Sequence, residues 1–116
     1  MANPVYKILT EDAFTEARRK GHFLGSADDL RDGFIHLSLA DQLDGTLAKH
    51  YAGQDGLLLL AFDPVRLGAE LKWEPSRGGA LFPHLYAPLD LAAMLWAEPL
   101  ELGQNGVHRL PKRTAV

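Results

Sequence analysis

The sequence predicts an α+β domain with a small, mixed, largely antiparallel split sheet and two N-terminal helices. Two helical patterns occur in the first half of the 116 residues, and short strand-like segments dominate the rest. Helices and strands do not alternate regularly, which argues against a doubly wound parallel sheet. The length suits one domain, which we place at residues 1–116 with an ordered core over about 4–110.

The first two elements are predicted to be a strand over residues 5–9 and a helix over residues 11–20. Thr10 is suited to cap the helix, because its hydroxyl can accept from a free backbone N–H of the first turn. Gly21 follows the helix, where a left-handed residue commonly closes it. Residues 22–32 are polar and rich in Gly, Ser and Asp, which predicts a loop with at most one helical turn.

A strand that runs into a helix is predicted over residues 34–51. The segment FIHLS (34–38) follows a tight turn and has strand character. Ser38 is suited to cap the helix, with Asp41 as its capping-box partner. Apolar side chains then recur every four residues, at Leu39, Leu43, Leu47 and Tyr51. This spacing is typical of a buried helical stripe.

The later segments are predicted to be mostly strands. Residues 57–62 form a continuous apolar run, which predicts a central strand covered on both faces. Residues 70–74 alternate between apolar and charged side chains. The segment FPHLY (82–86) is predicted to be extended, and Pro83 predicts that it lies at a sheet edge or is irregular, because proline donates no ladder hydrogen bond. Asp90 is suited to cap a turn over 91–93, and short strands follow at 94–97, 100–102 and 107–110.

The composition argues against several classes of protein. The absence of cysteine removes disulfides, thiolate metal ligands and a cysteine nucleophile, and it suits a reducing cytoplasm. The longest apolar run, residues 57–62, is far shorter than the roughly twenty residues of a membrane span. Residues 1–4 do not resemble a signal peptide. The net charge is −3 and the basic residues form no stripe, so nucleic-acid binding is not favoured.

The segment FIHLS (34–38) is the first candidate for a functional site. Because side chains alternate along a strand, Phe34, His36 and Ser38 share one face. We expect that face to meet a ligand near a helix start, where free backbone N–H groups favour anions. In the alternative interpretation, Ser38 only caps the helix and His36 is a buried ring bonded to the backbone.

The segment FPHLY (82–86) repeats this arrangement. His84 and Tyr86 share a face with Phe82, which offers a donor and acceptor pair beside a flat apolar ring. Glu74 could orient an imidazole or bind a ribose hydroxyl. The alternatives are a core aromatic cluster around a satisfied histidine and a solvated glutamate at a strand edge.

Gln42, one turn into the predicted helix, could also reach this region. Further candidates are Tyr6, Arg31 and Arg77. The chain contains no GxSxG, GxxxxGK[ST], GxGxxG or HExxH motif. His36, His84 and Glu74 show no metal-ligand spacing, so no metal is expected.

DGFIHLS (32–38) with Gln42, WE (73–74) and FPHLY (82–86) together resemble a bacterial family, the domain of unknown function 952. The stretch GHFLGS (21–26) fits as well, and the resemblance runs from residue 5 to about residue 100. It implies a fold similar to ADP-ribosyltransferase domains, with a split sheet and a NAD-binding cleft.

The same resemblance implies roles for individual residues. His36 and Ser38 match the histidine and small hydroxyl residue that contact the ribose in that fold. Tyr86 is the counterpart of an aromatic residue that stacks on nicotinamide. Glu98 or Glu101 stands where active members carry a catalytic glutamate, but neither lies in a recognisable motif.

We therefore expect a cleft that binds NAD, ADP-ribose or a related phosphorylated nucleoside. The catalytic candidates are His36, His84 and Glu74. The candidates for ligand binding are Phe34, Ser38, Gln42 and Tyr86. ADP-ribosyl or glycosidic transfer is the enzymatic version of this hypothesis. A non-catalytic ligand- or protein-binding module and a domain with purely structural histidines remain as alternatives, and a metal-dependent hydrolase ranks last.

Overall fold

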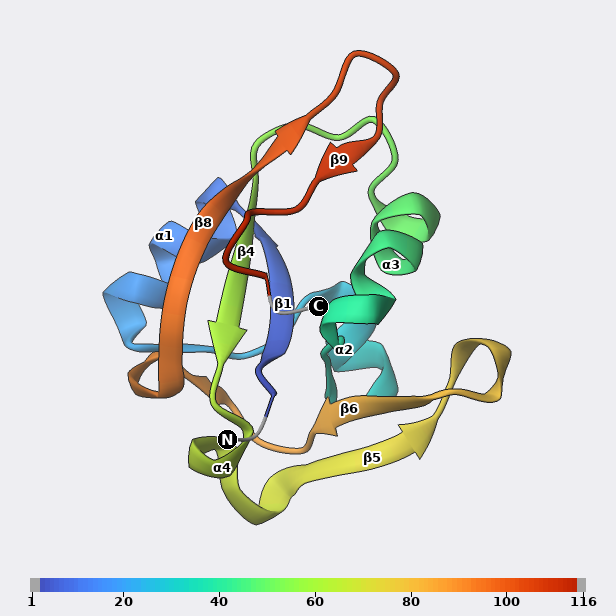
Figure 1. Cartoon of the computed structure of the whole chain (residues 1–116). Helices are drawn as coiled ribbons and strands as arrows, with labels where there is room; N and C mark the ends of the chain where they lie inside the picture. The colour runs from blue at the N-terminus through green and yellow to red at the C-terminus, as the bar shows by residue number, and fades with distance from the viewer. Residues whose placement is uncertain (1–2, 115–116) are drawn as a thin grey trace.

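The computed structural model describes residues 3–114. Its larger sheet has four antiparallel strands in the order β1-β4-β8-β9. Its strands are β1 (Val5–Thr10), β4 (Leu57–Phe62), β8 (Met94–Leu102) and β9 (His108–Arg109). Figure 1 shows β4 between β1 and β8. The outermost residues of the predicted domain, 1–2 and 115–116, lie outside the described residues.

Two smaller sheets complete the fold. One has the order β3-β6-β5, and its strands are β3 (Ile35–His36), β5 (Leu71–Pro75) and β6 (Leu81–Leu85). The other pairs β2 (His22–Phe23) with β7 (Leu89–Asp90). Every named strand pair within residues 3–114 is antiparallel. The predicted α+β class with a largely antiparallel, divided sheet is confirmed.

Helix α1 (Glu11–Lys20) has the predicted bounds and caps. The Thr10 hydroxyl accepts from Ala13 N at 3.1 Å. Gly21 ends the helix with φ 86°, a left-handed conformation that glycine adopts without strain. The cap signals are local in sequence, so the prediction needed no knowledge of tertiary contacts.

Helix α2 (Ala27–Asp32) occupies much of the segment predicted as a loop. The prediction of two N-terminal helices is therefore wrong, because α1, α2 and α3 all precede residue 51. Ser26 and Asp29 form a capping box at its start. The only buried residue of α2 is Asp29, a carboxylate, so hydrophobic periodicity gave no signal for it.

The helix after FIHLS begins differently from the prediction. A 3-10 turn (Ala40–Gln42) precedes α3 (Leu43–His50). The predicted capping box of Ser38 and Asp41 is wrong, because Gln42 Oε1 accepts from Leu39 N at 2.9 Å instead. The backbone of Ser38 exchanges two hydrogen bonds with Tyr6, which holds it extended. The remaining helical segments are α4 (Pro64–Leu67) and the 3-10 turns Gly68–Glu70, Arg77–Gly79 and Leu91–Ala93.

Pro83 lies in the central strand of the three-stranded sheet, so the prediction of an edge or irregular segment is wrong. Its carbonyl accepts from Leu37 N at 3.0 Å. The reciprocal bond of an antiparallel pair cannot form, because proline has no N–H. Strand β3 accordingly stops at His36 and is shorter than the five residues predicted for FIHLS.

The late strands also differ from the prediction. Residues 94–97 and 100–102 belong to one strand, β8, which continues through Pro99. β9 pairs only with Glu101 and Leu102, so β8 is an edge strand at Pro99 and tolerates the missing donor. The predicted strand over 107–110 is reduced to the two residues of β9. Asp90 caps the 3-10 turn that follows it, as predicted.

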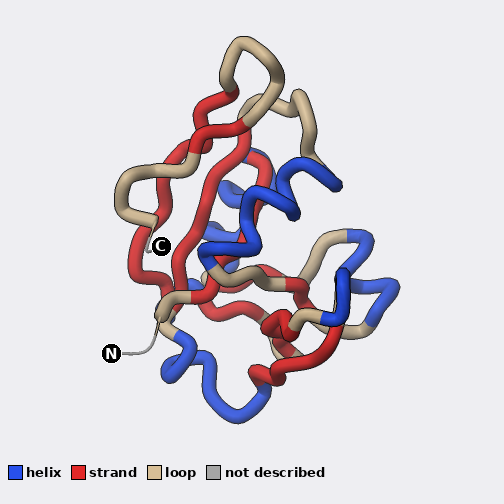
Figure 2. The backbone as a smooth tube through the Cα atoms, turned by 45° about the vertical axis from the view of Figure 1, so that its right-hand side comes forward, coloured by secondary structure: helices blue, strands red, loops and turns tan. Residues whose placement is uncertain are grey.

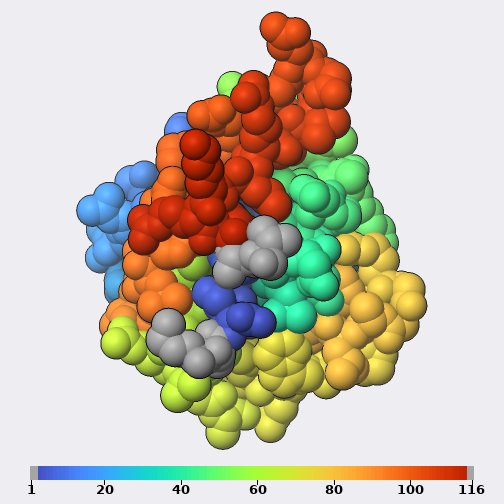
Figure 3. Space-filling view, viewed as in Figure 1, coloured from blue at the N-terminus to red at the C-terminus, as the bar shows by residue number. Residues whose placement is uncertain are grey.

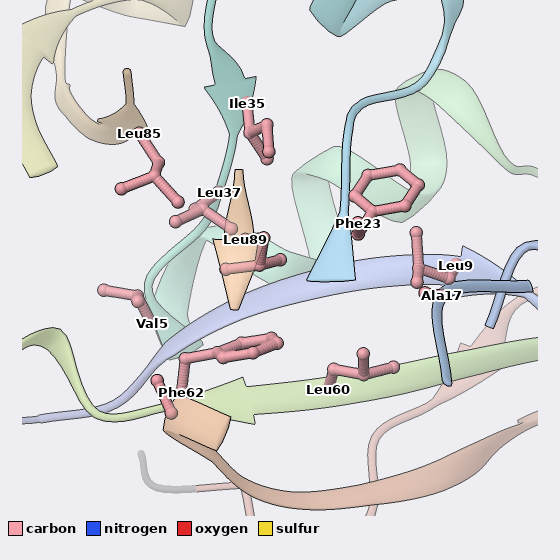
Figure 4. Close-up of a cluster of buried hydrophobic side chains, with 11 residues drawn as sticks. Val5, Leu9, Ala17, Phe23, Ile35, Leu37, Leu60, Phe62, Leu85 and Leu89 are labelled. Atoms are coloured by element: carbon pink, nitrogen blue, oxygen red, sulfur yellow. The ribbon is translucent and has the colours of Figure 1, made fainter. Parts of the chain in front are cut away.

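The core divides into two clusters on the two faces of β4. Leu60 and Phe62 belong to a cluster that also contains Ala17 of α1 and Leu85 of β6 (Figure 4). Leu59, on the other face, belongs to a cluster completed by the apolar side of α3. Figure 2 shows α3 lying over the strands of the larger sheet. The prediction of a central strand buried on both faces is confirmed.

The first cluster also joins the three-stranded sheet β3-β6-β5, which we call the smaller sheet, to the larger sheet. Ile35 of β3, Leu37 just after it and Leu85 of β6 belong to this cluster together with Val5 and Phe62 (Figure 4). The opposite face of β3 and β6, which carries the histidines, is left free to line a cavity. Within residues 3–114, no helix is long and apolar enough to cross a membrane.

Candidate functional site

A cavity of about 270 Å³ lies where β1, α2, β3, α3 and β6 meet. Its lining includes His36, Ser38 and His84, and we call it the histidine cavity. His36 and His84 are directly opposite one another in the pairing of β3 with β6. Their ring centroids are 5.6 Å apart. The two motifs therefore meet at one site, although they are distant in sequence.

Both ring nitrogens of His36 face carboxylates from α2. Nδ1 lies 2.7 Å from Asp29 Oδ1, and Nε2 lies 2.9 Å from Asp32 Oδ2. The backbone N–H of His36 also donates to Asp29 Oδ1 at 3.0 Å. The short helix α2 thus fixes the first imidazole from two sides.

Asp29 is itself held by a buried ion pair with Lys7 of β1. Lys7 Nζ lies 2.9 Å from Asp29 Oδ2 and also donates to the carbonyl of His36 at 2.9 Å. Only 2% of Asp29 and 6% of Lys7 are exposed. Burial raises the pKa of Asp29, but the His36 hydrogen bond and the Lys7 charge outweigh it and hold this pKa well below its usual value. Burial lowers the pKa of Lys7, against the opposing charge of Asp29.

The sequence analysis missed Lys7 and Asp29. Two signals could have found them. A lysine inside the apolar strand VYKIL requires a partner if that strand is buried. Asp29 follows Ser26 by three residues, which is the spacing of a capping box.

His84 is oriented by Glu74 of β5. Glu74 Oε1 accepts from His84 Nδ1 at 2.8 Å and from the Tyr86 hydroxyl at 2.7 Å. The hydrogen bonds from Tyr86 and His84 lower the pKa of Glu74. With Nδ1 donating to a carboxylate, the neutral ring presents Nε2 as an acceptor. Within residues 3–114, no hydrogen bond reaches that nitrogen.

The ring of Phe34 packs against both imidazoles. Its ring stacks on His84 with a centroid distance of 4.0 Å and an interplanar angle of 25°. It also contacts His36 at 4.6 Å and Tyr86 at 5.3 Å. Phe34 therefore supports the rings mechanically.

Four predicted site residues are not among the described residues that line the cavity, namely Phe34, Gln42, Glu74 and Tyr86. Gln42 caps the turn before α3 and donates to the Leu81 carbonyl at 2.8 Å. Glu74 and Tyr86 act on His84, and Phe34 packs on both rings. Their predicted catalytic and ligand-binding roles remain predictions.

The remaining candidates from the sequence, Tyr6, Arg31 and Arg77, all line the histidine cavity. α3 adds Thr46, Lys49 and His50 to the wall, and Tyr51 follows directly after the helix; none of these was predicted as a site residue. The space-filling view shows the β5–β6 turn, in gold, close to α3, in teal (Figure 3). Within residues 3–114, no group of three or more His, Asp or Glu side chains is arranged to hold a metal ion.

The two imidazoles of the site differ in their carboxylate partners. His36 has a carboxylate beside each nitrogen, whereas His84 has one at Nδ1 only. A histidine with a carboxylate at one nitrogen and an open second nitrogen can move a proton to or from a bound molecule. The site can therefore bind a polar ligand and supply an acid–base group to it.

Comparison with known proteins identifies relatives along most of the chain. Residues 8–97 match the family model described as "Protein of unknown function (DUF952)". The X-ray structure of protein CC0527 from Caulobacter crescentus has 48% sequence identity and a TM-score of 0.89, and the match covers 92% of this chain and 94% of that chain. The solution NMR structure of CC0527 has 49% identity and a TM-score of 0.81, with 90% of each chain covered. None of the curated proteins matches. The chain belongs to the DUF952 family, whose function is unknown.

Proposed function

We propose that the histidine cavity binds a phosphorylated nucleoside, with NAD and ADP-ribose as the ligands to test first. The observation that carries this proposal is the meeting of His36 and His84 at one polar cavity. Hydroxyls of Ser38 and Thr46 and the guanidinium of Arg77 line the same space. These groups suit a sugar and an anion. The ADP-ribosyltransferase-like character of the fold is part of this proposal and rests on the sequence motifs.

The size of the cavity limits how much ligand it can enclose. Its volume of about 270 Å³ is just below the roughly 300–1,000 Å³ of typical small-molecule sites. A ribose phosphate is therefore a better match than a whole dinucleotide. In the proposed complex, the remainder of NAD or ADP-ribose lies outside the cavity.

The enzymatic version of the proposal assigns acid–base chemistry to His84. As the C–N bond between ribose and nicotinamide breaks, nicotinamide leaves as a neutral molecule with the bonding electron pair. The ribose gains oxocarbenium character, and water or an acceptor hydroxyl forms the new C–O bond. His84 Nε2 takes the proton that this hydroxyl loses, and Glu74 stabilises the resulting imidazolium.

Isothermal titration calorimetry with NAD and ADP-ribose tests the binding proposal. We expect the wild type to bind at least one of them, and His84→Ala to lose that affinity. His22→Ala is the matched control, because His22 lies on β2 and is not among the residues that line the cavity. A folded wild type that binds neither compound would refute the proposal. Thermal unfolding of each variant separates loss of binding from loss of fold.

A non-catalytic binding module is the second candidate. The observation that favours it is the pairing of both His36 nitrogens with carboxylates, which leaves that ring without a nitrogen for proton transfer. Release of nicotinamide from NAD distinguishes the candidates. Binding without release would favour the module, as would an intact nucleotide that co-purifies and is identified by mass spectrometry.

A further inference from the structure

We infer that Arg77 forms the centre of a phosphate subsite in the histidine cavity, an inference that rests on the proposed function. Arg77 belongs to the turn between β5 and β6, which reaches toward α3 (Figure 1). Its side chain is half-buried and lines the cavity. The subsite would make the phosphate, rather than the base, the part of the ligand that sets affinity.

The guanidinium of Arg77 is held on several sides. Its Cζ lies 4.9 Å from the centroid of the Phe82 ring, a cation–π contact. Nη1 donates to Thr46 Oγ1 and Nη2 donates to the Gln42 carbonyl, each at 3.4 Å. A guanidinium has five N–H donors, and these two long bonds use only two of them. The group is thus positioned in advance, with donors left for a ligand.

Gly45 makes room for this arrangement. It lies inside α3, where glycine weakens a helix relative to alanine. A β-carbon at this position would be 2.9 Å from Arg77 Nη2, closer than real contacts allow. The absence of a side chain at this helical position therefore allows the guanidinium of Arg77 to approach α3 closely.

Arg77 and Lys49 carry the unpaired positive charge of the cavity wall. Among residues 3–114, neither of them has a carboxylate partner at ion-pair distance. The carboxylates that α2 contributes are already paired with Lys7, His36 or Arg31. An incoming anion would thus find uncompensated cations, and the planar guanidinium matches the geometry of phosphate oxygens.

Two hydroxyls connect this subsite to the histidines. Thr46 Oγ1 contacts both Arg77 Nη1 and Ser38 Oγ, the latter at 3.2 Å. Ser38 lies two residues after His36. A phosphate on Arg77 would therefore place the attached sugar beside Ser38 and toward the imidazoles.

The test compares AMP with adenosine by calorimetry on the full chain. We expect the wild type to bind AMP more tightly than adenosine. Arg77→Ala should weaken AMP binding by roughly 10- to 100-fold and leave adenosine binding unchanged, because only the charged hydrogen bonds are lost. Arg77→Lys should restore part of the affinity, since it keeps the charge without the fork.

Two further variants sharpen the comparison. Gly45→Ala should weaken AMP binding by displacing Arg77 without lowering the melting temperature. Arg66→Ala removes a positive charge from α4, where Arg66 lies 3.8 Å from Asp63, and should leave AMP binding unchanged. Its result separates local recognition from the loss of net charge.

The possible failures differ from one another. Equal affinity of Arg77→Ala and wild type for AMP would overturn the subsite, as would a wild type that does not prefer AMP to adenosine. If the wild type bound NAD or ADP-ribose in that case and His84→Ala abolished this binding, the proposed function would stand. A wild type that binds none of AMP, NAD and ADP-ribose would overturn both the subsite and the proposed function.

Discussion

Glu74 uses one carboxylate oxygen to hold both His84 and Tyr86, so it decides which nitrogen of His84 remains open. Replacing it with glutamine keeps the shape but removes the charge that stabilises a protonated imidazole. If the protein turns over NAD, Glu74→Gln should slow nicotinamide release by about 100-fold or more, within the range for acid–base groups.

Tyr86→Phe is the matched control for that substitution. It removes one of the two hydrogen bonds to Glu74 and leaves the carboxylate on His84 intact. It should therefore reduce release far less than Glu74→Gln. Equal effects of the two substitutions would show that the hydrogen bond from Tyr86 to Glu74 matters as much as the charge of Glu74.

The buried pair of Lys7 and Asp29 makes a strong prediction about stability. Asp29→Asn should destabilise the protein by about 3–5 kcal/mol, because it leaves a buried ammonium without its counter-charge. Adding Lys7→Met should recover most of that loss. Chemical denaturation measures both values. Asp28→Asn, which alters an exposed pair on the same helix, should change stability little.

The carboxyl group of Asp29 also predicts how the free energy of unfolding changes in acid. Its pKa is lower in the folded chain than the value of about 3.9 in an unfolded chain. In the range between the two values the unfolded state binds more protons, so the free energy of unfolding falls as the pH falls. The contribution of Asp29 is fully present well above pH 3.9 and is lost progressively below it.

Denaturation of the wild type and of the double variant Lys7→Met with Asp29→Asn, measured from pH 6 down to pH 2, tests this dependence. The wild type should lose stability more steeply than the double variant below about pH 4. Parallel curves would mean that other carboxyl groups account for the acid sensitivity.

At the scale of single elements, α2 links the fold to the site. Ser26→Ala removes one half of its capping box and should cost about 1 kcal/mol. Because α2 carries both carboxylates that hold His36, the same variant should also weaken ligand binding. Thr10→Ala removes an equivalent cap from α1, whose residues do not appear in the cavity wall, and should cost a similar amount without affecting binding. Calorimetry and thermal unfolding of the two variants provide the comparison.

How well each element could be predicted depended on where its stabilising contacts come from. α1 was predicted with correct bounds because Thr10 and Gly21 act on their immediate neighbours. α2 was not, because its one buried side chain belongs to an ion pair with a distant strand. The edge position assigned to Pro83 failed because the neighbouring strand ends where the missing donor would be needed.

The prediction of the site likewise succeeded where local patterns sufficed and failed where tertiary packing decides. Strand alternation was enough to place His36 and His84 on faces that could meet, and the antiparallel pairing brings them opposite one another. The position of Asp29 beside His36 depends on how α2 packs, which the sequence pattern does not encode. Arg77 was only one of several charged candidates until its contact with α3 showed where the guanidinium lies.

At the scale of the whole molecule, β4 connects the two clusters of the core. Leu60 faces the cluster shared with the smaller sheet, and Leu59 faces the cluster shared with α3. Both side chains are fully buried. Disruption of β4 would expose both clusters together, so the smaller sheet has no separate core to keep it folded. We therefore expect the chain to unfold as one cooperative unit.

The two tryptophans provide a test of this expectation, because they report on different sheets. Trp73 lies on β5 of the smaller sheet, and Trp96 lies on β8 of the larger one beside Tyr6. Trp96→Phe leaves a probe of the smaller sheet, and Trp73→Phe leaves a probe of the larger one. Within each variant, the fluorescence midpoint in urea should coincide with the midpoint from far-ultraviolet circular dichroism.

Comparing two signals within one variant removes the effect of the substitution on overall stability. If the Trp73 signal changed at a lower urea concentration than the circular dichroism, the smaller sheet would unfold on its own. The histidine cavity would then open before the four-stranded sheet melts, because β3 and β6 supply His36 and His84. Coincident midpoints would instead mean that the cavity lasts as long as the core beneath it, with the site and the fold sharing a single free energy of unfolding.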